Sequence, residues 1–83
     1  MLDHDFLQRF NAACDGHTVL KSMPRAERVM MLARECCISP DIVATYFEGE
    51  RPRATAMRKV ATYLDCGEVW LSMGMPSHAS ARR

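Results

Sequence analysis

Four basic residues lie within nine positions in the second half of this 83-residue sequence: Arg51, Arg53, Arg58 and Lys59. No acidic residue interrupts them, so the segment 51–59 is strongly cationic. Such a cluster is suited to holding phosphate groups, whose neutralisation releases counterions. The alternative interpretation is a solvated basic face that pairs with the acidic side chains on either side of it, Glu48, Glu50 and Asp65.

The other side chains that could take part in catalysis or metal binding are scattered. They are three histidines and four cysteines: His4, His17, His78, Cys14, Cys36, Cys37 and Cys66. The histidines share no predicted helix face with a carboxylate at metal-ligand spacing. The cysteines form no CxxC pair, which favours buried, reduced thiols over a metal site or a disulfide framework. We therefore expect no metal, no cofactor and no enzymatic activity.

Length and composition predict one small domain. Hydrophobic residues make up 48% of the chain and charged residues 25%, and the net charge of +1 excludes a polycation. The first residues carry Asp3 and Asp5 where a signal peptide would be cationic, and no apolar run approaches the ~20 residues of a membrane span. We expect a cytoplasmic protein with no membrane partner, with its domain over residues 1–75 and a flexible tail over 76–83.

Apolar spacing and helix-breaking residues predict an all-α fold, a compact bundle of about five short helices. The expected ranges are 5–14, 24–37, 40–48, 53–65 and 68–73, whereas 17–22 fits either a helical turn or an extended link. Pro24 is expected as the first helical residue of its segment. The clearest start signal is Ser39-Pro40-Asp41, which combines a capping hydroxyl, a proline that needs no N–H partner and an acid near the helix dipole.

The segment 29–48, VMMLARECCISPDIVATYFE, has the pattern of a helix-turn-helix. Ala33 is the small residue that lets the second helix cross the first closely. Apolar residues surround the turn and continue into the second helix: Cys36, Ile38, Val43 and Tyr46. The turn position that usually holds glycine, because its φ is positive, is Cys37 here, so we expect some backbone strain at Cys37.

These residues and those that follow resemble the phage-repressor (Cro and cI) type of helix-turn-helix family. Members tend to continue with glycine, a basic residue and proline, then a helix and a final aromatic-leucine segment. This sequence continues with Gly49-Glu50-Arg51-Pro52, then MRKVATYL, then VWLSMG. The match extends from residue 29 to residue 74 without a gap, and the first helix matches more loosely.

The resemblance implies a transcriptional regulator, a phage or prophage repressor, that binds double-stranded DNA as a homodimer with helix 40–48 in the major groove. The residues then expected to face the bases are Ser39, Pro40, Asp41, Ala44 and Thr45. Those expected to contact phosphates are Arg28, Arg51, Arg53, Arg58 and Lys59. Those expected at a dimer or partner surface are Ile42, Trp70, Met73 and Met75.

The predicted recognition helix has an unusual composition for reading DNA. It holds no Arg, Lys, Asn or Gln, the side chains that make bidentate base contacts, and residues 39–50 include three acids and no base. Val29, Pro40 and Ile42 are also apolar where the family is polar. The alternative function is therefore a protein-binding adaptor or inhibitor that presents this apolar surface to a regulatory or host protein.

Overall fold

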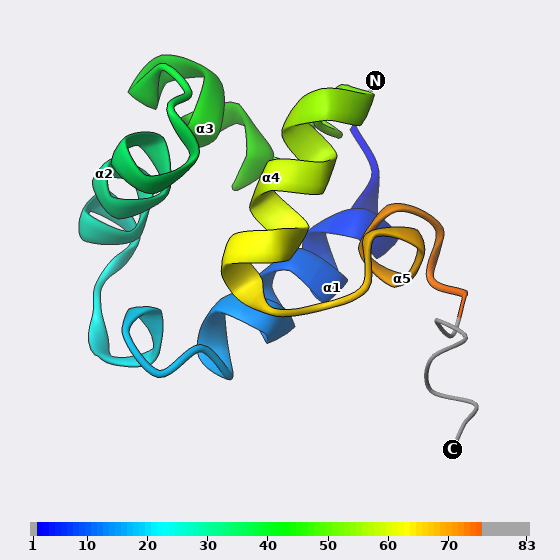
Figure 1. Cartoon of the computed structure of the whole chain (residues 1–83), viewed down its shortest axis with the longest axis horizontal. Coiled ribbons are helices and arrows are strands. Elements are labelled where there is room, and N and C mark those ends of the chain that lie inside the picture. Colours follow the sequence, from blue (N-terminus) through cyan, green and yellow to red (C-terminus); the bar gives the residue numbers. More distant parts are fainter. Residues whose placement is uncertain (1, 76–83) are drawn as a thin grey trace.

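Five α-helices and one 3₁₀ turn build the computed structural model, which describes residues 2–75 (Figure 1). In chain order they are α1 (His4–Asp15), η1 (Leu20–Ser22), α2 (Arg25–Cys36), α3 (Pro40–Tyr46), α4 (Ala54–Leu64) and α5 (Glu68–Met73). This part of the chain contains no strand, and the predicted all-α bundle of about five short helices is confirmed. Within it, no helix is long and apolar enough to span a membrane. The tail predicted for residues 76–83 lies outside the described residues.

Helix ends differ from the sequence prediction by up to two residues. The assignment of Pro24 as the first helical residue was wrong by one position, since Pro24 is the extended residue that precedes α2. α3 ends at Tyr46 and not at Glu48, because the amide of Gly49 donates to the carbonyl of Tyr46 in a turn. The segment 17–22, for which the sequence allowed two conformations, contains the short helix η1.

α1 contributes the aromatic centre of the core. Asp3 caps this helix, since its Oδ1 accepts a hydrogen bond of 3.0 Å from the amide of Phe6. The helical repeat then places Phe6, Phe10 and Cys14 on one fully buried face. The ring centroid of Phe10 lies 4.7 Å from that of Phe47, which follows α3, so the aromatic centre joins α1 to the end of α3.

α4 lies in the middle of the bundle. In Figure 1 the α2–α3 pair lies on one side of it and α5 on the other, and α4 packs against both α2 and α5. Four apolar residues at helical spacing form its buried face: Met57, Val60, Ala61 and Leu64. Because α4 contacts both sides, side chains from its first turn can reach the surface of α3, and side chains further along it can reach α5.

α2 and α3 are joined by a turn of three residues, 37–39. Cys37 has φ 58° and ψ 46°, the positive φ that the sequence predicted at this position. The amides of Cys37 and Ile38 both donate to the carbonyl of Ala33, whose small, buried side chain lets the two helices approach. Ser39 directly precedes α3, but the capping hydrogen bond expected for its hydroxyl does not form.

Candidate nucleic-acid interface

α3 has one buried side and one exposed side. Val43 and Tyr46 are only 1% and 3% exposed, and they anchor the helix to the core. Pro40 and Asp41, at the start of the helix, are exposed, and Ile42 is 51% exposed. The helical repeat places Val43 and Tyr46 on one face, because they are three residues apart. The exposed side of α3 is therefore accessible to a large partner.

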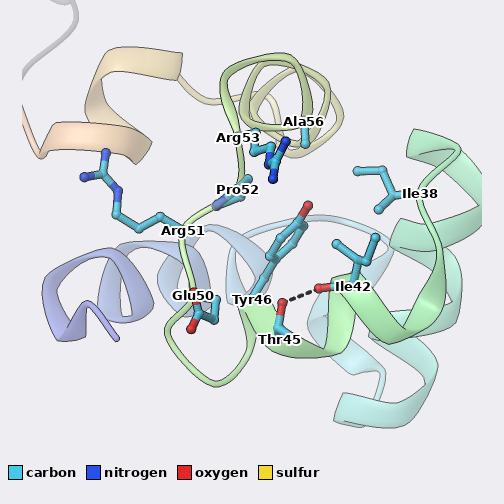
Figure 2. A pocket seen from close by; sticks show the side chains of 9 residues that line it. All are labelled: Ile38, Ile42, Thr45, Tyr46, Glu50, Arg51, Pro52, Arg53 and Ala56. Atoms are coloured by element: carbon cyan, nitrogen blue, oxygen red, sulfur yellow. Dashed lines mark hydrogen bonds between the residues drawn. The ribbon is translucent and has the colours of Figure 1, made fainter. Parts of the chain in front are cut away.

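Three of the five residues predicted to face DNA bases are exposed: Ser39, Pro40 and Asp41. The other two, Ala44 and Thr45, are partly buried. The Thr45 hydroxyl also donates a hydrogen bond of 2.6 Å to the carbonyl of Ile42, which leaves its oxygen as an acceptor only (Figure 2). The most accessible part of the predicted surface is therefore the start of α3 and the turn before it.

A hollow of about 380 Å³ separates α3 from the start of α4 (Figure 2). α3 contributes Ile42, Thr45 and Tyr46 to its lining, and Pro52 and Arg53 line it from the α4 side. The guanidinium of Arg53 forms no ion pair or hydrogen bond with any other residue that the structure describes. The hollow thus brings the exposed side of α3 together with one unpaired member of the predicted basic cluster.

Two other members of this cluster are engaged with the C-terminal part of the fold. Arg51 donates hydrogen bonds to the carbonyl and the hydroxyl of Ser72, at 2.7 and 2.6 Å, and in Figure 2 it points away from the hollow. Arg58 lies 3.6 Å from a carboxylate oxygen of Glu68, although its side chain is largely exposed. To contact phosphates, Arg51 and Arg58 would have to exchange these intramolecular partners.

Unlike Arg53, Arg28 is held by other parts of the fold and is not available to a partner. Its Nε donates to the carbonyl of Leu20 at 2.9 Å, and a second guanidinium nitrogen donates to the carbonyl of Lys21. Another nitrogen lies 2.9 Å from the carboxylate of Asp15, and the side chain is only 13% exposed. These contacts tie α2 to η1 and α1, so the guanidinium that was expected to contact phosphate is held inside the fold.

Lys59 is the second member of the predicted basic cluster without a partner in the described part of the chain. Its side chain is exposed and forms no ion pair or hydrogen bond within residues 2–75. It borders another hollow together with Cys37, and Ile38, the next residue in the turn, lines the first hollow. Arg53 and Lys59 therefore line two hollows that both reach the α2–α3 turn.

The apolar residues proposed as a partner surface occupy different environments. Val29 is half-buried and packs against the core, so it does not extend the exposed surface of Pro40 and Ile42 as the adaptor hypothesis expected. Trp70 is also half-buried against the core. Met73 and Met75 are largely exposed near the end of α5.

Most of the cysteines, together with His17, contribute to the folded structure and not to a binding site. Burial raises the pKa of Cys14 to about 12 and that of Cys66 to about 11, which keeps both thiols protonated. Cys37 is exposed, contrary to the expectation of four buried thiols. The His17 ring accepts hydrogen bonds from two backbone amides at Nδ1 and stacks on Tyr63. Within residues 2–75 there is no cluster of three metal-ligating side chains.

The sequence did not single out the hydroxyl of Tyr46. Tyr46 was assigned to the apolar spacing of the second helix, and its ring is indeed buried. Its hydroxyl nevertheless lines the hollow beside Arg53, and a tyrosine in place of phenylalanine was the one signal of a polar role (Figure 2).

No family model matches this chain, and no curated protein or solved structure matches it either.

Proposed function

We propose that this protein binds double-stranded DNA through the exposed side of α3, with α2 and α3 acting as a helix-turn-helix of the phage-repressor type. The observation that carries the proposal is the hollow in which α3 and the unpaired Arg53 line one surface. A helix that enters the major groove needs one free side and cations beside it to hold the flanking phosphates. The left-handed Cys37 turn and the close approach at Ala33 support the same interpretation.

The side chains divide into two groups in this proposal. Ser39, Pro40 and Asp41 face the bases, since they are exposed at the start of α3. Arg53 and Lys59 hold phosphates, because they have no partner in the described part of the fold. Arg51 and Arg58 join them only by leaving Ser72 and Glu68. As a cytoplasmic dimer bound at an operator, the protein would act as a repressor of phage or prophage genes.

The test is a salt titration of DNA binding, followed by fluorescence anisotropy on duplexes recovered from a genomic pull-down. Each phosphate contact contributes about −0.9 to the slope of log K against log salt. Arg53→Ala and Lys59→Ala should each flatten the slope by about this amount and weaken binding to all sequences alike. Arg34→Ala is the matched control, since Arg34 is an exposed base on α2 that pairs with its neighbour Glu35.

Two outcomes would contradict the proposal. One is the absence of measurable affinity for any duplex at low salt. The other is an equal loss of affinity in Arg53→Ala and Arg34→Ala, which would indicate unspecific attraction to the whole charged surface. Replacement of Asp41 by alanine should instead change the preference between sites, because a carboxylate accepts hydrogen bonds only from bases that offer an amino group.

Protein binding is the second candidate function, and the exposure of Ile42 favours it. Ile42 is a large apolar side chain that is 51% exposed, next to Asp41 on a helix without cations. Such a surface is suited to a protein partner. Ile42→Asp should then abolish capture of a purified partner, while Arg53→Ala should leave it intact. Met30→Asp is the control, because Met30 is similarly exposed on α2. Loss of partner capture in both aspartate variants would contradict a site at Ile42.

A further inference from the structure

Tyr46 combines a buried ring with a hydroxyl that lacks a partner. The residue is 3% exposed, and its ring packs edge-on against Phe10, at 6.3 Å between centroids. No group among residues 2–75 exchanges a hydrogen bond with its hydroxyl. A buried hydroxyl without a partner is costly, so native structures nearly always satisfy it. Because the Tyr46 hydroxyl borders the hollow between α3 and α4, its partner can come from outside the protein.

Arg53 and the first turn of α4, through Ala56, border the same hollow and offer further hydrogen-bond donors. The guanidinium of Arg53 has no partner among the described residues and lies beside the Tyr46 hydroxyl in Figure 2. The start of α4 has no side-chain cap, and the first amide bonded to a preceding carbonyl is that of Met57. The amides of residues 54–56 are therefore open donors at the positive end of an 11-residue helix.

We propose that this hollow is a binding site for a phosphate group, with the Tyr46 hydroxyl, the Arg53 guanidinium and the first amides of α4 as its donors. A phosphate offers several acceptor oxygens and a negative charge, which matches a phenol, a guanidinium and a helix N-terminus together. Glu50 is the acidic residue in the lining, and in Figure 2 its carboxylate points away from the hollow.

The rest of the lining favours a phosphate ester over a bare phosphate ion. Ile38, Ile42 and Pro52 form apolar walls, and the volume of about 380 Å³ lies within the range of small-ligand pockets. A sugar or another organic group would pack on these walls while the phosphate binds the donors. The ester can be the backbone of DNA, and the site then rests on the proposed function and deepens it. It can also be a free phosphorylated molecule, and the site then goes beyond that function.

The experiment uses the whole chain labelled with ¹⁵N. Sodium phosphate, phenyl phosphate and a duplex from the pull-down are titrated separately at constant ionic strength, with sodium chloride as the reference salt. Saturable shifts of the amide signals of residues 53–56 are expected, with phenyl phosphate binding more tightly than phosphate. Tyr46→Phe should weaken this binding about tenfold, as expected for a hydrogen bond to a charged acceptor.

Matched variants separate the site from general effects. Tyr63→Phe removes the other tyrosine hydroxyl, which lies outside this hollow, and should leave the affinity unchanged. Arg53→Gln should weaken binding by at least as much as Tyr46→Phe. Thermal melting of each variant checks the fold, and Tyr46→Phe should melt at the wild-type temperature or above, since it removes a hydroxyl without a partner.

Each outcome decides between the alternatives. Binding of the free esters together with their displacement by the duplex supports a site for backbone phosphate. Binding of the free esters without any duplex affinity supports a site for a small phosphorylated ligand and refutes the proposed function. Duplex affinity that Tyr46→Phe does not change, with no saturable shift by either ester, overturns the phosphate site and leaves the proposed function standing.

Discussion

Arg28 and Arg53 carry the same charge, but the fold gives them different surroundings. Arg28 follows the extended Pro24 by one helical turn and reaches back to the carbonyls of η1. Arg53 immediately precedes α4, where nothing in the described structure pairs with its guanidinium. At the scale of single residues, the sequence therefore predicted a basic cluster suited to phosphates, while contacts between segments decide which of its members have intramolecular partners.

Replacement of Arg28 tests its structural role. Arg28→Ala removes two hydrogen bonds to carbonyls and leaves the carboxylate of Asp15 without its cation. We expect a loss of about 2 kcal/mol in the free energy of unfolding, measured by urea denaturation. Arg28→Lys should not restore it, because an ammonium cannot reproduce the forked geometry of a guanidinium.

The control for this change is Arg34→Ala, which removes an exposed arginine from the same helix and should cost less than about 0.5 kcal/mol. Equal stabilities of Arg28→Ala and the wild type would show that the contacts of Arg28 contribute nothing. A salt slope for DNA that falls in Arg28→Ala as much as in Arg53→Ala would return Arg28 to the set of phosphate contacts.

Asp3 predicts an acid-dependent stability. The backbone amide of Phe6 and, to a smaller extent, the charge of Arg51 hold the pKa of Asp3 below its ordinary value of 3.8. As the pH falls, the unfolded chain binds a proton before the folded chain does, so the contribution of Asp3 is present above this value and is lost as the pH drops through the folded pKa. Asp3→Asn should therefore flatten the decline of the melting temperature below about pH 4.

The measurement is a series of thermal melts between neutral and acidic pH. Asp5→Asn is the control, since it removes an acid from the first turn of α1 and leaves the capping residue Asp3 unchanged. If the wild type and Asp3→Asn lose stability in parallel as the pH falls, the cap is not responsible for the acid dependence.

The α2–α3 turn is where local sequence was most informative at the scale of elements. Ala33, Cys37 and the Ser39-Pro40-Asp41 start signal predicted two helices separated by a tight turn, and the structure has that arrangement. These signals act between neighbouring residues, so they do not need the rest of the fold. The capping role of Ser39 was wrong, and the exposure of Val29 was also wrong because this side chain packs on the core.

Cys37→Gly should stabilise the protein. A residue with a side chain at φ 58° is strained, and glycine adopts this conformation without a steric penalty. The Cys37 side chain is exposed, so its removal costs little packing. We expect a gain of about 1 kcal/mol in the free energy of unfolding by urea denaturation.

Cys37→Ala separates the backbone effect from the loss of the thiol. Alanine keeps the Cβ atom that causes the strain, so this variant should have the stability of the wild type. A comparable gain in both variants would attribute the effect to the thiol and would contradict the strain at this turn.

At the scale of the whole molecule, one end of the bundle is more apolar than a monomer requires. Val69, Met73 and Met75 are at least half exposed on or just after α5, beside the half-buried Trp70. The proposed operator binding needs two recognition helices about one DNA turn apart, which a two-fold dimer supplies. We therefore propose this surface as the contact of such a dimer; it lies on the opposite side of α4 from α3 (Figure 1).

Met73→Glu tests this dimer contact. Light scattering after size exclusion should give twice the monomer mass of 9.4 kDa for the wild type and the monomer mass for the variant. A buried carboxylate without a cation would oppose association strongly. Met30→Glu is the control, because Met30 is similarly exposed on α2, and it should leave the dimer intact. A wild type that elutes as a monomer at high concentration would contradict the contact.

Local sequence was enough to predict the helices and the left-handed turn at Cys37, because apolar spacing, caps and breakers act over a few neighbouring positions. Which side chains are available for binding depended instead on how the helices pack. Arg51 is engaged by Ser72, 21 positions away, and the Tyr46 hydroxyl faces a hollow completed by the start of α4. Such partners come from different elements, so their contacts depend on how the helices pack, and no local pattern contains that information.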